Sequence, residues 1–597
     1  MQTFTKSPFI YNRRKTRELT VGNPSDGGVI IGGGNPIVVQ SMLTADTMDT
    51  NSCVQQTLDL VKAGCQIVRI TAPTVKDAAN LQNIVNELRK RNCKVPIVAD
   101  IHFKPEAAIE AAKWVEVVRI NPGNYADSKK FAVKAYTDDQ YKEELKKIEE
   151  KFTPLVLLCK DLKRAMRIGV NHGSLSDRIM NRYGDTPQGM IESALEFARI
   201  ARKNDFHNFK FSMKSSNPKI MIQCYRLLVA RLNELGEDWN YPLHLGVTEA
   251  GEGEDGRIKS AIGIGSLLCD GIGDTIRVSL TEDSVYEIPV CYELIELVKH
   301  LTIQREKLNG ETINLLSQFD FPFNPYQFQR RESYTVNSSL GFAIGGAELI
   351  RVFVTQSQYS NLPARYKESG DIRPEGVYED SSIIELNPLS ELPDIAENKI
   401  VTVSDNTPLP VIAAYRLLAA RLKNHNKRNP ILLKDTLNPE ETRQTIKNPL
   451  LFSSVNIGSL LCDGIGDVIL IRSETDPVKA LTLSYNILQS AGCRSFKTEY
   501  VACPSCGRTL FNLQEVTAKI KARTGHLKGV KIAIMGCIVN GPGEMADADF
   551  GYVGGAPGKV NLYVGKKPVK FNIPQEEAVD KLVELIKEHG KWSDPLP

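Results

Sequence analysis

Three cysteines near the end of the chain have the sequence context of metal or redox ligands. Cys503 and Cys506 lie on one short turn, "CPSCGRT", and Cys537 ends an apolar, strand-like run, "VKIAIMGC". The glycines and the proline that follow, in "IVNGPGE", are typical of a chain that turns sharply around a bulky group. Glu544 in this turn is the nearest oxygen donor. The three thiols therefore indicate a site that needs one further ligand.

Several kinds of site fit these thiols. A zinc site would use the three cysteines with His526, although most structural zinc sites draw their ligands as two close pairs. A dithiol redox pair needs only Cys503 and Cys506, which leaves Cys537 without a role. The closely spaced cysteines of a bacterial ferredoxin are absent. A four-iron cluster on three cysteines would leave one iron for a weaker ligand or a substrate, and that iron would be a Lewis acid. From the residues alone the cluster, zinc and the dithiol all stay open.

Composition points to an ordinary globular enzyme rather than a membrane or nucleic-acid-binding protein. Of the 597 residues, 42% are hydrophobic and 24% charged, and the formal net charge is +3. No uncharged stretch is long enough to cross a bilayer, and the basic N-terminus has no apolar core of the secretory kind. The other nine cysteines are scattered singly, so we expect buried thiols in a cytoplasmic protein of several domains.

A repeated pattern between residues 36 and 279 predicts the elements that position the chemistry. Short β-branched runs alternate with helical stretches, and each run ends in polar residues. Eight such units predict an α/β fold with a TIM barrel. The runs are "IVVQS", "QIVRI", "PIVADIH", "VVRINPG", "RIGVNHGS", "FKFSMKS", "LHLGVTEAG" and "TIRVSL".

The polar strand endings should meet at one mouth, because barrel enzymes place their chemistry at the C-terminal ends of the strands. The cations and neutral donors among them are Arg69, Arg119, Arg167, Lys214 and Arg277, with Asn121, Asn171 and Ser279. Cations gathered in this way repel one another unless an anion lies among them. A phosphorylated substrate is the natural partner, since the arginine fork can bind two phosphate oxygens. Alternatively, individual arginines form salt bridges with helix carboxylates outside the barrel.

Asp100, His102 and Glu249 are the acids and the histidine at the same strand endings. They could orient hydroxyl groups or move protons. His102 could equally be a hydrogen-bonded packing residue. Glu249 precedes a glycine-rich acidic loop, "GEGEDG", which is either a lid or a solvated surface loop.

The string "IGSLLCDGIGD" occurs twice, at residues 264–274 and 457–467. Chance repetition of this length is negligible, so the sequence predicts an internal duplication and a second, barrel-like domain. Its candidate strands are "ELIRVFV", "SIIEL", "KIVTVS", "PILLKD" and "DVILIRS". Leu470 and Arg472 stand where the first copy has Arg277 and Ser279. We therefore expect residues 1–291 to form the substrate-binding barrel, 292–495 a structural insert without a phosphate site, and 496–597 a small α/β domain that carries the cysteines.

Ten motifs, in order, resemble those of the 4-hydroxy-3-methylbut-2-en-1-yl diphosphate synthases, in the long form with an insert domain. The motifs are "PIVVQSM", "VRI", "ADIHF", "RINPGN", "RIGVNHGSL", "SMKSS", "HLGVTEAG", "GIGDTIRVSL", "CPSCGRT" and "GCIVNGPGE". They cover residues 1 to about 290 and 495–597, and the residues between them resemble the insert of the long form.

The resemblance implies reductive ring opening of 2-C-methyl-D-erythritol 2,4-cyclodiphosphate in the non-mevalonate route to isoprenoids. It implies a [4Fe-4S] cluster on Cys503, Cys506, Cys537 and Glu544, and a reduced ferredoxin or flavodoxin as electron donor. The cations and donors of the mouth match the diphosphate contacts of the family, and Asp100, His102 and Glu249 match its polar residues near the carbon skeleton. Two arrangements follow: a homodimer in which a partner supplies the cluster domain, as in the short form, or one chain that closes its own site.

Two other classes of protein are compatible with parts of the pattern. A non-redox barrel transferase acting on a diphosphate substrate could carry a structural zinc in its tail. A nucleic-acid-binding protein could use "CPSCGRT" as a zinc knuckle beside the basic segment "RRKTR", but the near-balanced charge and the lack of interleaved aromatic residues argue against it.

Overall fold

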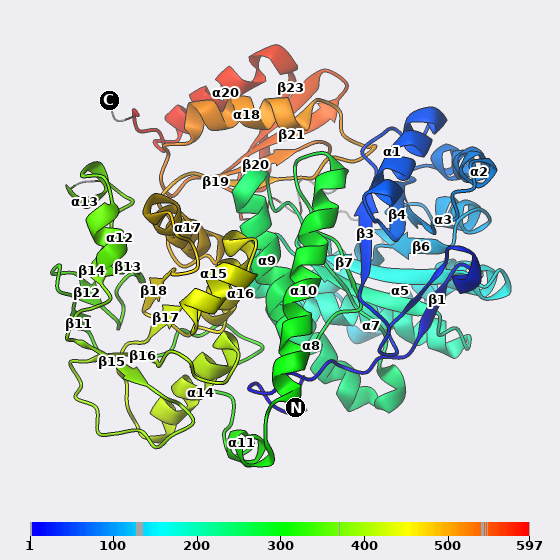
Figure 1. Ribbon diagram of the computed structural model, residues 1–597. Coiled ribbons are helices and arrows are strands. Elements are labelled where there is room, and N and C mark those ends of the chain that lie inside the picture. The colour runs from blue at the N-terminus through cyan, green and yellow to red at the C-terminus, as the bar shows by residue number, and fades with distance from the viewer. Residues whose placement is uncertain are drawn as a thin grey trace.

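The computed structural model describes residues 3–126, 135–368, 370–538, 543, 545 and 547–595. Three regions are visible in Figure 1: a barrel in blue to green, an insert in green to yellow beside it, and a C-terminal domain in orange and red that lies above the barrel. Within the described part of the chain, no helix has the length and apolarity needed to cross a membrane.

The predicted eight-stranded parallel barrel is confirmed. Its hydrogen-bonded order is β8-β7-β6-β5-β4-β3-β10-β9, and a parallel bridge between Phe211 and Leu243 joins the two ends. The strands are β3 Val38–Met42, β4 Ile67–Thr71, β5 Ile97–Asp100, β6 Val117–Ile120, β7 Ala165–Asn171, β8 Phe209–Lys214, β9 His244–Leu245 and β10 Thr275–Ile276. Each of the eight predicted runs overlaps one of these strands.

Helices cover the outside of the barrel. They are α1 Thr50–Lys62, α2 Val75–Lys90, α3 Pro105–Ala112, α4 Pro122–Tyr125, α5 Asp138–Asp161, α6 Asp177–Tyr183, α7 Pro187–Lys203, α8 Pro218–Leu235, α9 Gly253–Cys269 and α10 Glu287–Glu306. Polar caps set where several of them begin: the side chain of Thr74 accepts from the backbone N–H of Asp77 at the start of α2, and Thr186 does the same for Gly189 in α7. The predicted boundary after residue 291 falls inside α10.

An apolar plug closes the end of the barrel opposite the site. The hairpin of β1 (Leu19–Val21) and β2 (Val29–Ile31) packs against the first residues of five barrel strands. Those residues are Val38, Ile67, Val98, Val117 and Ala165. Because this end is filled with apolar side chains, polar chemistry is confined to the other end.

The insert is an incomplete copy of the barrel. A four-stranded sheet, β14-β13-β18-β17, and the pair β15-β16 are joined by a parallel bridge between Val401 and Ile431. The strands are β13 Arg351–Val354, β14 Gly376–Val377, β15 Ile383–Leu386, β16 Ile400–Val403, β17 Leu432–Lys434 and β18 Val468–Leu470. The hairpin of β11 (Val336–Asn337) and β12 (Ala343–Ile344) occupies the place of β1 and β2. The helices are α11 Gly310–Leu316, α12 Gln356–Asn361, α13 Arg365–Glu368, α14 Val411–Asn424, α15 Pro439–Thr445, α16 Pro449–Cys462 and α17 Pro477–Ser490.

The two copies pack against each other through equivalent helices. α9 and α16, which carry the repeated string, lie side by side, and Ser266 hydrogen-bonds its counterpart Ser459 at 2.7 Å. A Cβ on Gly265 would lie 2.4 Å from Val455, and one on its counterpart Gly458 would lie 2.4 Å from Ile262. This symmetric close approach is what the glycines of the repeat allow.

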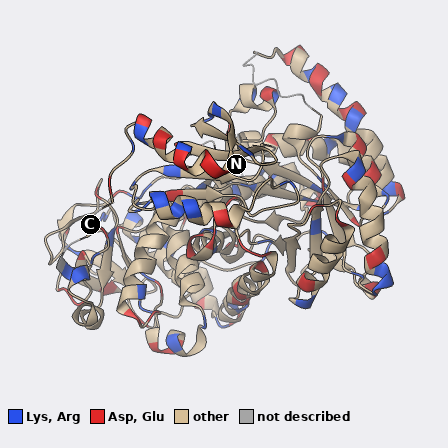
Figure 2. Ribbon diagram, turned by 90° about the horizontal axis from the view of Figure 1, so that it is seen from above, with Lys and Arg blue, Asp and Glu red and all other residues tan. Residues whose placement is uncertain are grey.

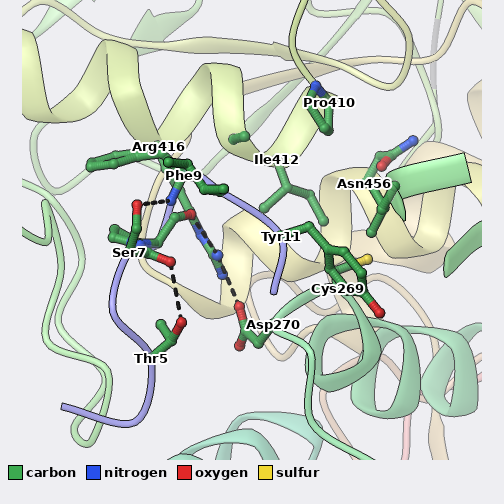
Figure 3. A pocket seen from close by; sticks show the side chains of 14 residues that line it. Thr5, Ser7, Phe9, Tyr11, Cys269, Asp270, Pro410, Ile412, Arg416 and Asn456 are labelled. Atoms are coloured by element: carbon green, nitrogen blue, oxygen red, sulfur yellow. Dashed lines mark hydrogen bonds and ion pairs between the residues drawn. The ribbon is translucent and has the colours of Figure 1, made fainter. Parts of the chain in front are cut away.

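Four buried charges tie the same interface together. Arg226 and its counterpart Arg416 each contact both Asp270 and its counterpart Asp463, at N–O distances of 2.7 to 2.9 Å. Figure 3 shows the pair of Arg416 and Asp270, with the N-terminal segment passing beside it between the barrel and the insert. One hydrophobic core runs through both regions, so the insert and the barrel fold as a single body.

The C-terminal domain has its own cores and a five-stranded sheet of order β19-β20-β21-β22-β23. Its elements are β19 Glu499–Ala502, α18 Leu513–Thr524, β20 Lys531–Met535, β21 Phe550–Ala556, β22 Lys559–Val564, β23 Lys567–Pro574 and α20 Gln575–Glu588. In Figure 2, acidic and basic residues are interspersed along the outer helices. Separate cores make this domain the part of the molecule that can move relative to the barrel.

Candidate active site

A cavity lies where the C-terminal domain covers the open mouth of the barrel. Eight of the predicted barrel residues line it, and so do the three predicted cysteines. These residues are Arg69, His102, Arg119, Asn171, Lys214, Glu249, Arg277 and Ser279 from the barrel, with Cys503, Cys506 and Cys537. Cations and thiols that are far apart in the sequence therefore share one enclosed space within a single chain.

Arg119 organises the acid and the histidine at the mouth. Its guanidinium donates to Asp100 at 2.8 Å and to the Asn171 side chain at 3.0 Å, and it lies 2.6 Å from Nε2 of His102. Asp100 lies just behind the cavity wall. Burial alone would raise the pKa of Asp100, but Arg69 and Arg119 outweigh it and hold that pKa well below its usual value. Asp100 is therefore a fixed negative charge that orients cations.

His102 is neutral in this environment. Burial, followed by the charge of Arg119, lowers the pKa of His102 to about 3. A histidine with such a pKa does not carry a second ring proton at neutral pH, so His102 can donate and accept hydrogen bonds as a neutral imidazole but is not a cationic acid there.

Two cations of the mouth differ in how they are held. Arg277 forms a two-point ion pair with Glu287, the first residue of α10, at 3.1 and 3.2 Å. The side-chain ammonium group of Lys214 has neither a hydrogen bond nor an ion pair among the described residues. Burial and then the charges of Arg69, Arg167 and Arg277 hold the pKa of Lys214 well below its usual value. An anion in the cavity would relieve that repulsion.

Glu249 is held at the cavity by an uncommon backbone conformation. It is buried, with φ at 48°, in the left-handed region that non-glycine residues seldom adopt. Ser505, between the first two cysteines, has φ at 55°. Such conformations cost free energy and are typical of functional sites, where the surrounding structure holds them in place.

Two predicted residues lie away from the cavity wall. Asn121 caps α4, accepting from the backbone N–H of Gly123 at 3.3 Å, and donates to Ser174 at 3.2 Å. Arg167 is buried deeper inside the barrel, where its Nε and Nη1 have no hydrogen-bond partner in the described structure. Glu544, the predicted fourth ligand, lies outside the described residues.

The three thiols are the kind of donor that holds iron–sulfur clusters in proteins. None of the twelve cysteines, all of them in the described part of the chain, forms a disulfide, and Cys503, Cys506 and Cys537 are partly exposed and line the shared cavity. The backbone N–H of Gly536 donates to the sulfur of Cys503 at 3.3 Å, a contact that tunes bound iron–sulfur groups. Nowhere in the described ranges do three ligating side chains gather closely enough to hold a single ion.

His526 does not join the thiols. Its Nε2 lies 2.7 Å from the carbonyl oxygen of Ser593, and its ring packs edge-on against Trp592. It is not among the residues that line the cavity. The zinc set that the sequence allowed is therefore not assembled in this structure.

Main-chain contacts hold the thiol-bearing loop onto the barrel. Ala250, beside Glu249, forms a parallel bridge with Ala502, and the hydroxyl of Thr281 donates to the carbonyl oxygen of Cys503 at 3.1 Å. A Cβ on Gly507 would lie 2.6 Å from the carbonyl oxygen of Ala45. The loop can thus approach the barrel closely only with glycine at that position.

The structure adds polar residues that were not predicted. Arg508, two positions after Cys506, faces the cavity. Gln40, Lys210 and His244 lie inside the barrel, buried, with side-chain atoms that lack partners among the described residues. The two-residue alternation along β8 could have revealed Lys210, which points to the same side as Lys214.

A parallel barrel with a cationic mouth, roofed by thiols of a separate domain, defines a class: barrel enzymes that act on an anionic substrate beside a thiol-bound centre. The chain belongs to the GcpE family. Residues 16–292 match the family model described as the GcpE TIM-barrel domain, and residues 499–588 match the GcpE protein C-terminal domain. The family resemblance noted from the motifs is confirmed.

Curated relatives match over nearly the whole chain. A 4-hydroxy-3-methylbut-2-en-1-yl diphosphate synthase (flavodoxin) of Akkermansia muciniphila is 56% identical, over 99% of this chain and 99% of the relative. An enzyme of the same name from Leptospira interrogans is 46% identical over 99% of both chains. The chloroplastic ferredoxin-dependent synthase of Oryza sativa is 43% identical over 100% of this chain and 89% of its own.

Proposed function

We propose that this chain opens the ring of 2-C-methyl-D-erythritol 2,4-cyclodiphosphate reductively and releases (E)-4-hydroxy-3-methylbut-2-en-1-yl diphosphate. The observation that carries the proposal is the single cavity lined both by the cations of the barrel and by three thiols of the C-terminal domain. Full-length similarity to enzymes of that name supports it. The reaction takes up two electrons and two protons, breaks one carbon to phosphate-oxygen bond and releases one water.

The barrel residues bind and orient the cyclic diphosphate. Lys214, Arg69 and Arg277 face the cavity and can contact phosphate oxygens directly. Fixed cations also stabilise the negative charge that develops on phosphate oxygen as the ring bond breaks, and they need no rearrangement to do so. Arg119 is already committed to Asp100 and Asn171, so it keeps the surrounding side chains in place.

Glu249 is the residue we assign to the proton that converts the departing hydroxyl group to water. It lines the cavity beside the thiol-bearing loop, and its backbone is held there by the bridge between Ala250 and Ala502. His102 is less suited to this step, because its lowered pKa leaves it neutral. Asp100 is occupied by three arginines.

Cys503, Cys506 and Cys537 are the residues that would hold a [4Fe-4S] cluster, with Glu544 as the inferred fourth ligand. When bound, such a cluster supplies electrons and a Lewis-acidic iron that can polarise the alcohol oxygen. The chain itself contributes the polar roof of the cavity and keeps bulk water out. We infer that reduced flavodoxin or ferredoxin delivers the electrons, as the names of the relatives state for those enzymes. The free thiols agree with a reducing compartment such as the cytoplasm.

The test of the proposal is product formation without oxygen. Anaerobically purified protein, the cyclic diphosphate and a reduced flavodoxin or ferredoxin should give the linear allylic diphosphate, identified by mass spectrometry and ³¹P NMR. Omitting the electron donor should abolish product. Consumption of the substrate at an equal rate without any reductant would contradict a reductive reaction and favour transferase or hydrolase chemistry.

We also infer that one chain forms a complete site, because barrel and thiols of the same chain line the cavity. Mixing a Glu249→Gln protein, inactive in the barrel, with a Cys537→Ser protein, inactive in the C-terminal domain, tests this. If each chain closes its own site, the mixture should recover essentially no activity. Recovery toward a quarter or half of the wild-type rate would indicate closure between chains.

A further inference from the structure

Arg508 is a cation that the C-terminal domain extends into the barrel mouth. It lies on the thiol-bearing loop and lines the cavity together with Arg69, Arg119 and Lys214. Its side chain is only 9% exposed. Among the described residues that line the cavity, it is the one Lys or Arg that does not come from the barrel. Arg508 therefore connects the C-terminal domain to the substrate-binding mouth of the barrel.

In this structure Arg508 faces the thiol of Cys506 on its own loop and the carboxylate of Asp100 in the barrel, and these two groups leave part of its fork unused. Nη2 lies 3.7 Å from Oδ2 of Asp100, which is too far for a hydrogen bond. Nε and Nη1 have no hydrogen-bond partner among the described residues. A buried guanidinium with empty donors is costly, so the site is built for a ligand that supplies further oxygen atoms.

Asp100 cannot be that ligand, because other arginines already share it. Arg119 donates to it at 2.8 Å, and Arg69 lies at 3.6 Å. One carboxylate thus faces three guanidinium groups from two domains. The surplus positive charge around it matches an anion with two or more negative charges.

Other charged contacts between the domain and the barrel lie outside the cavity, and two of them are typical. Lys259 pairs with Glu499 at 3.1 Å, and Lys521 pairs with Glu252 at 2.8 Å. These pairs are polar and partly exposed, and the domain has hydrophobic cores separate from that of the barrel. Interfaces of this kind open readily. Opening is also required, since the thiol-bearing loop covers the mouth through which substrate must enter.

We propose that Arg508 is a substrate-binding residue supplied by the C-terminal domain, and that it transfers from Asp100 to phosphate oxygens of the bound diphosphate. The planar fork of arginine suits two oxygens of one phosphate. Substrate binding then adds a further link between the C-terminal domain and the barrel and stabilises the closed position of the thiol-bearing loop. This inference rests on the proposed function for the identity of the anion.

The experiment compares holoenzyme variants with inorganic pyrophosphate and the cyclic diphosphate as probes. Affinity is measured by calorimetry, and closure by hydrogen exchange of the amides in β19 and the thiol-bearing loop. Wild-type protein should gain protection there when either probe binds. Arg508→Gln should bind pyrophosphate about 10- to 100-fold more weakly and gain no protection at matched occupancy. Arg523→Gln, an exposed arginine of the same domain that pairs with Asp580, is the matched control and should behave as wild type.

Arg508→Lys separates ligand binding from simple support of the loop. It keeps the charge beside Asp100 but loses the fork, so affinity should fall several-fold while iron content stays normal. If Arg508→Gln loses iron, the affinity and the exchange protection of Arg508→Lys decide whether Arg508 binds the ligand. Wild-type affinity and wild-type protection in Arg508→Lys, or in an iron-replete Arg508→Gln, would overturn the proposal. Pyrophosphate-driven closure without turnover of the cyclic diphosphate would instead refute the proposed function and leave the role of Arg508 standing.

Discussion

The barrel and the insert are two versions of one scaffold, and they differ most in what fills the inside. Strand register aligns them, because Thr275 and Val468 follow the two copies of the repeated string. Five polar positions inside the barrel are apolar in the insert. The aligned pairs are Gln40 with Phe353, Arg167 with Ile383, Lys210 with Ile400, His244 with Leu432 and Arg277 with Leu470.

The insert shows that the scaffold folds without internal charge. Phe353, Ile400, Leu432 and Leu470 form one buried apolar cluster. Burying unpaired cations costs free energy, and replacing them by packed apolar residues is often neutral or stabilising. The polar interior of the barrel is therefore retained for binding rather than for folding.

The mouth of the insert also has fewer unpaired charged side chains than the mouth of the barrel. Among the described residues of the insert, no strands correspond to β5 and β6, which carry Asp100 and Arg119 at the barrel mouth. Two cations at the strand ends of the insert, Lys434 and Arg472, are neutralised by one carboxylate. Lys434 lies 2.6 Å from Asp405, and Arg472 contacts Asp405 at 2.6 and 2.8 Å. A phosphate would have to displace Asp405 to bind there. We expect the insert to act as a scaffold.

The largest expected effect comes from removing the acid that only the barrel has. Leu437 aligns with Glu249. Glu249→Gln should leave the affinity for the cyclic diphosphate and the iron content unchanged but lower kcat by roughly 10²- to 10⁴-fold, the usual contribution of a proton-transfer group. Single-turnover kinetics would check this. A near-normal rate would remove Glu249 from the proton-transfer role.

The next largest effect should come from converting one residue of the barrel mouth to its counterpart in the insert. Ser404 aligns with Lys214, so Lys214→Ser should weaken binding of the cyclic diphosphate by about 10- to 100-fold, as loss of a charged hydrogen bond does. Lys434→Ala in the insert is the matched control: Lys434 is buried and does not line the cavity, so kcat/KM of the folded variant should stay essentially unchanged even if its stability falls. Abolished turnover in a folded Lys434→Ala protein would show that the insert has a binding role.

The smallest effect should be a gain in stability. Burial, followed by the charge of Arg167, lowers the pKa of Lys210 to about 7. The charged form is thus disfavoured in the folded state, and this penalty is fully present below that pKa and shrinks as pH rises toward the ordinary lysine value. Lys210→Ile, the insert residue, should raise the unfolding free energy by roughly 1–3 kcal/mol. The gain should be larger at about pH 6 than at about pH 9.

Thermal unfolding of the unliganded protein at both pH values measures this effect. A lower melting temperature in Lys210→Ile would contradict the view that the buried lysine is held at a cost to stability. Affinity for the cyclic diphosphate should fall in the same variant, because a cation beneath the mouth is lost.

Local patterns in the sequence predicted the strands and most of the cavity wall. β-branched runs with polar endings identified all eight barrel strands, and the rule that barrel chemistry lies at the C-terminal ends located Lys214 and Glu249. Asn121 shows the limit of that rule. A polar residue between a strand and Pro122 is also the pattern of a helix cap, and the structure uses it as one.

Contacts between distant segments could not be predicted. The repeated string revealed the duplication. It did not reveal that a side chain of the other copy would pack directly against Gly265 and against Gly458. Likewise, the position of Arg508 beside Asp100 depends on how a separate domain docks on the barrel. Such packing is determined by the whole surface of each partner rather than by a local pattern.

The most direct test of the central claim is metal and sulfide analysis of anaerobically purified protein, followed by EPR after reduction. The account predicts close to four irons and four sulfides per chain and a signal that changes when the cyclic diphosphate is added, because the thiols and the cations line one cavity. One zinc without sulfide, or an iron signal indifferent to the substrate, would contradict a substrate-facing redox centre.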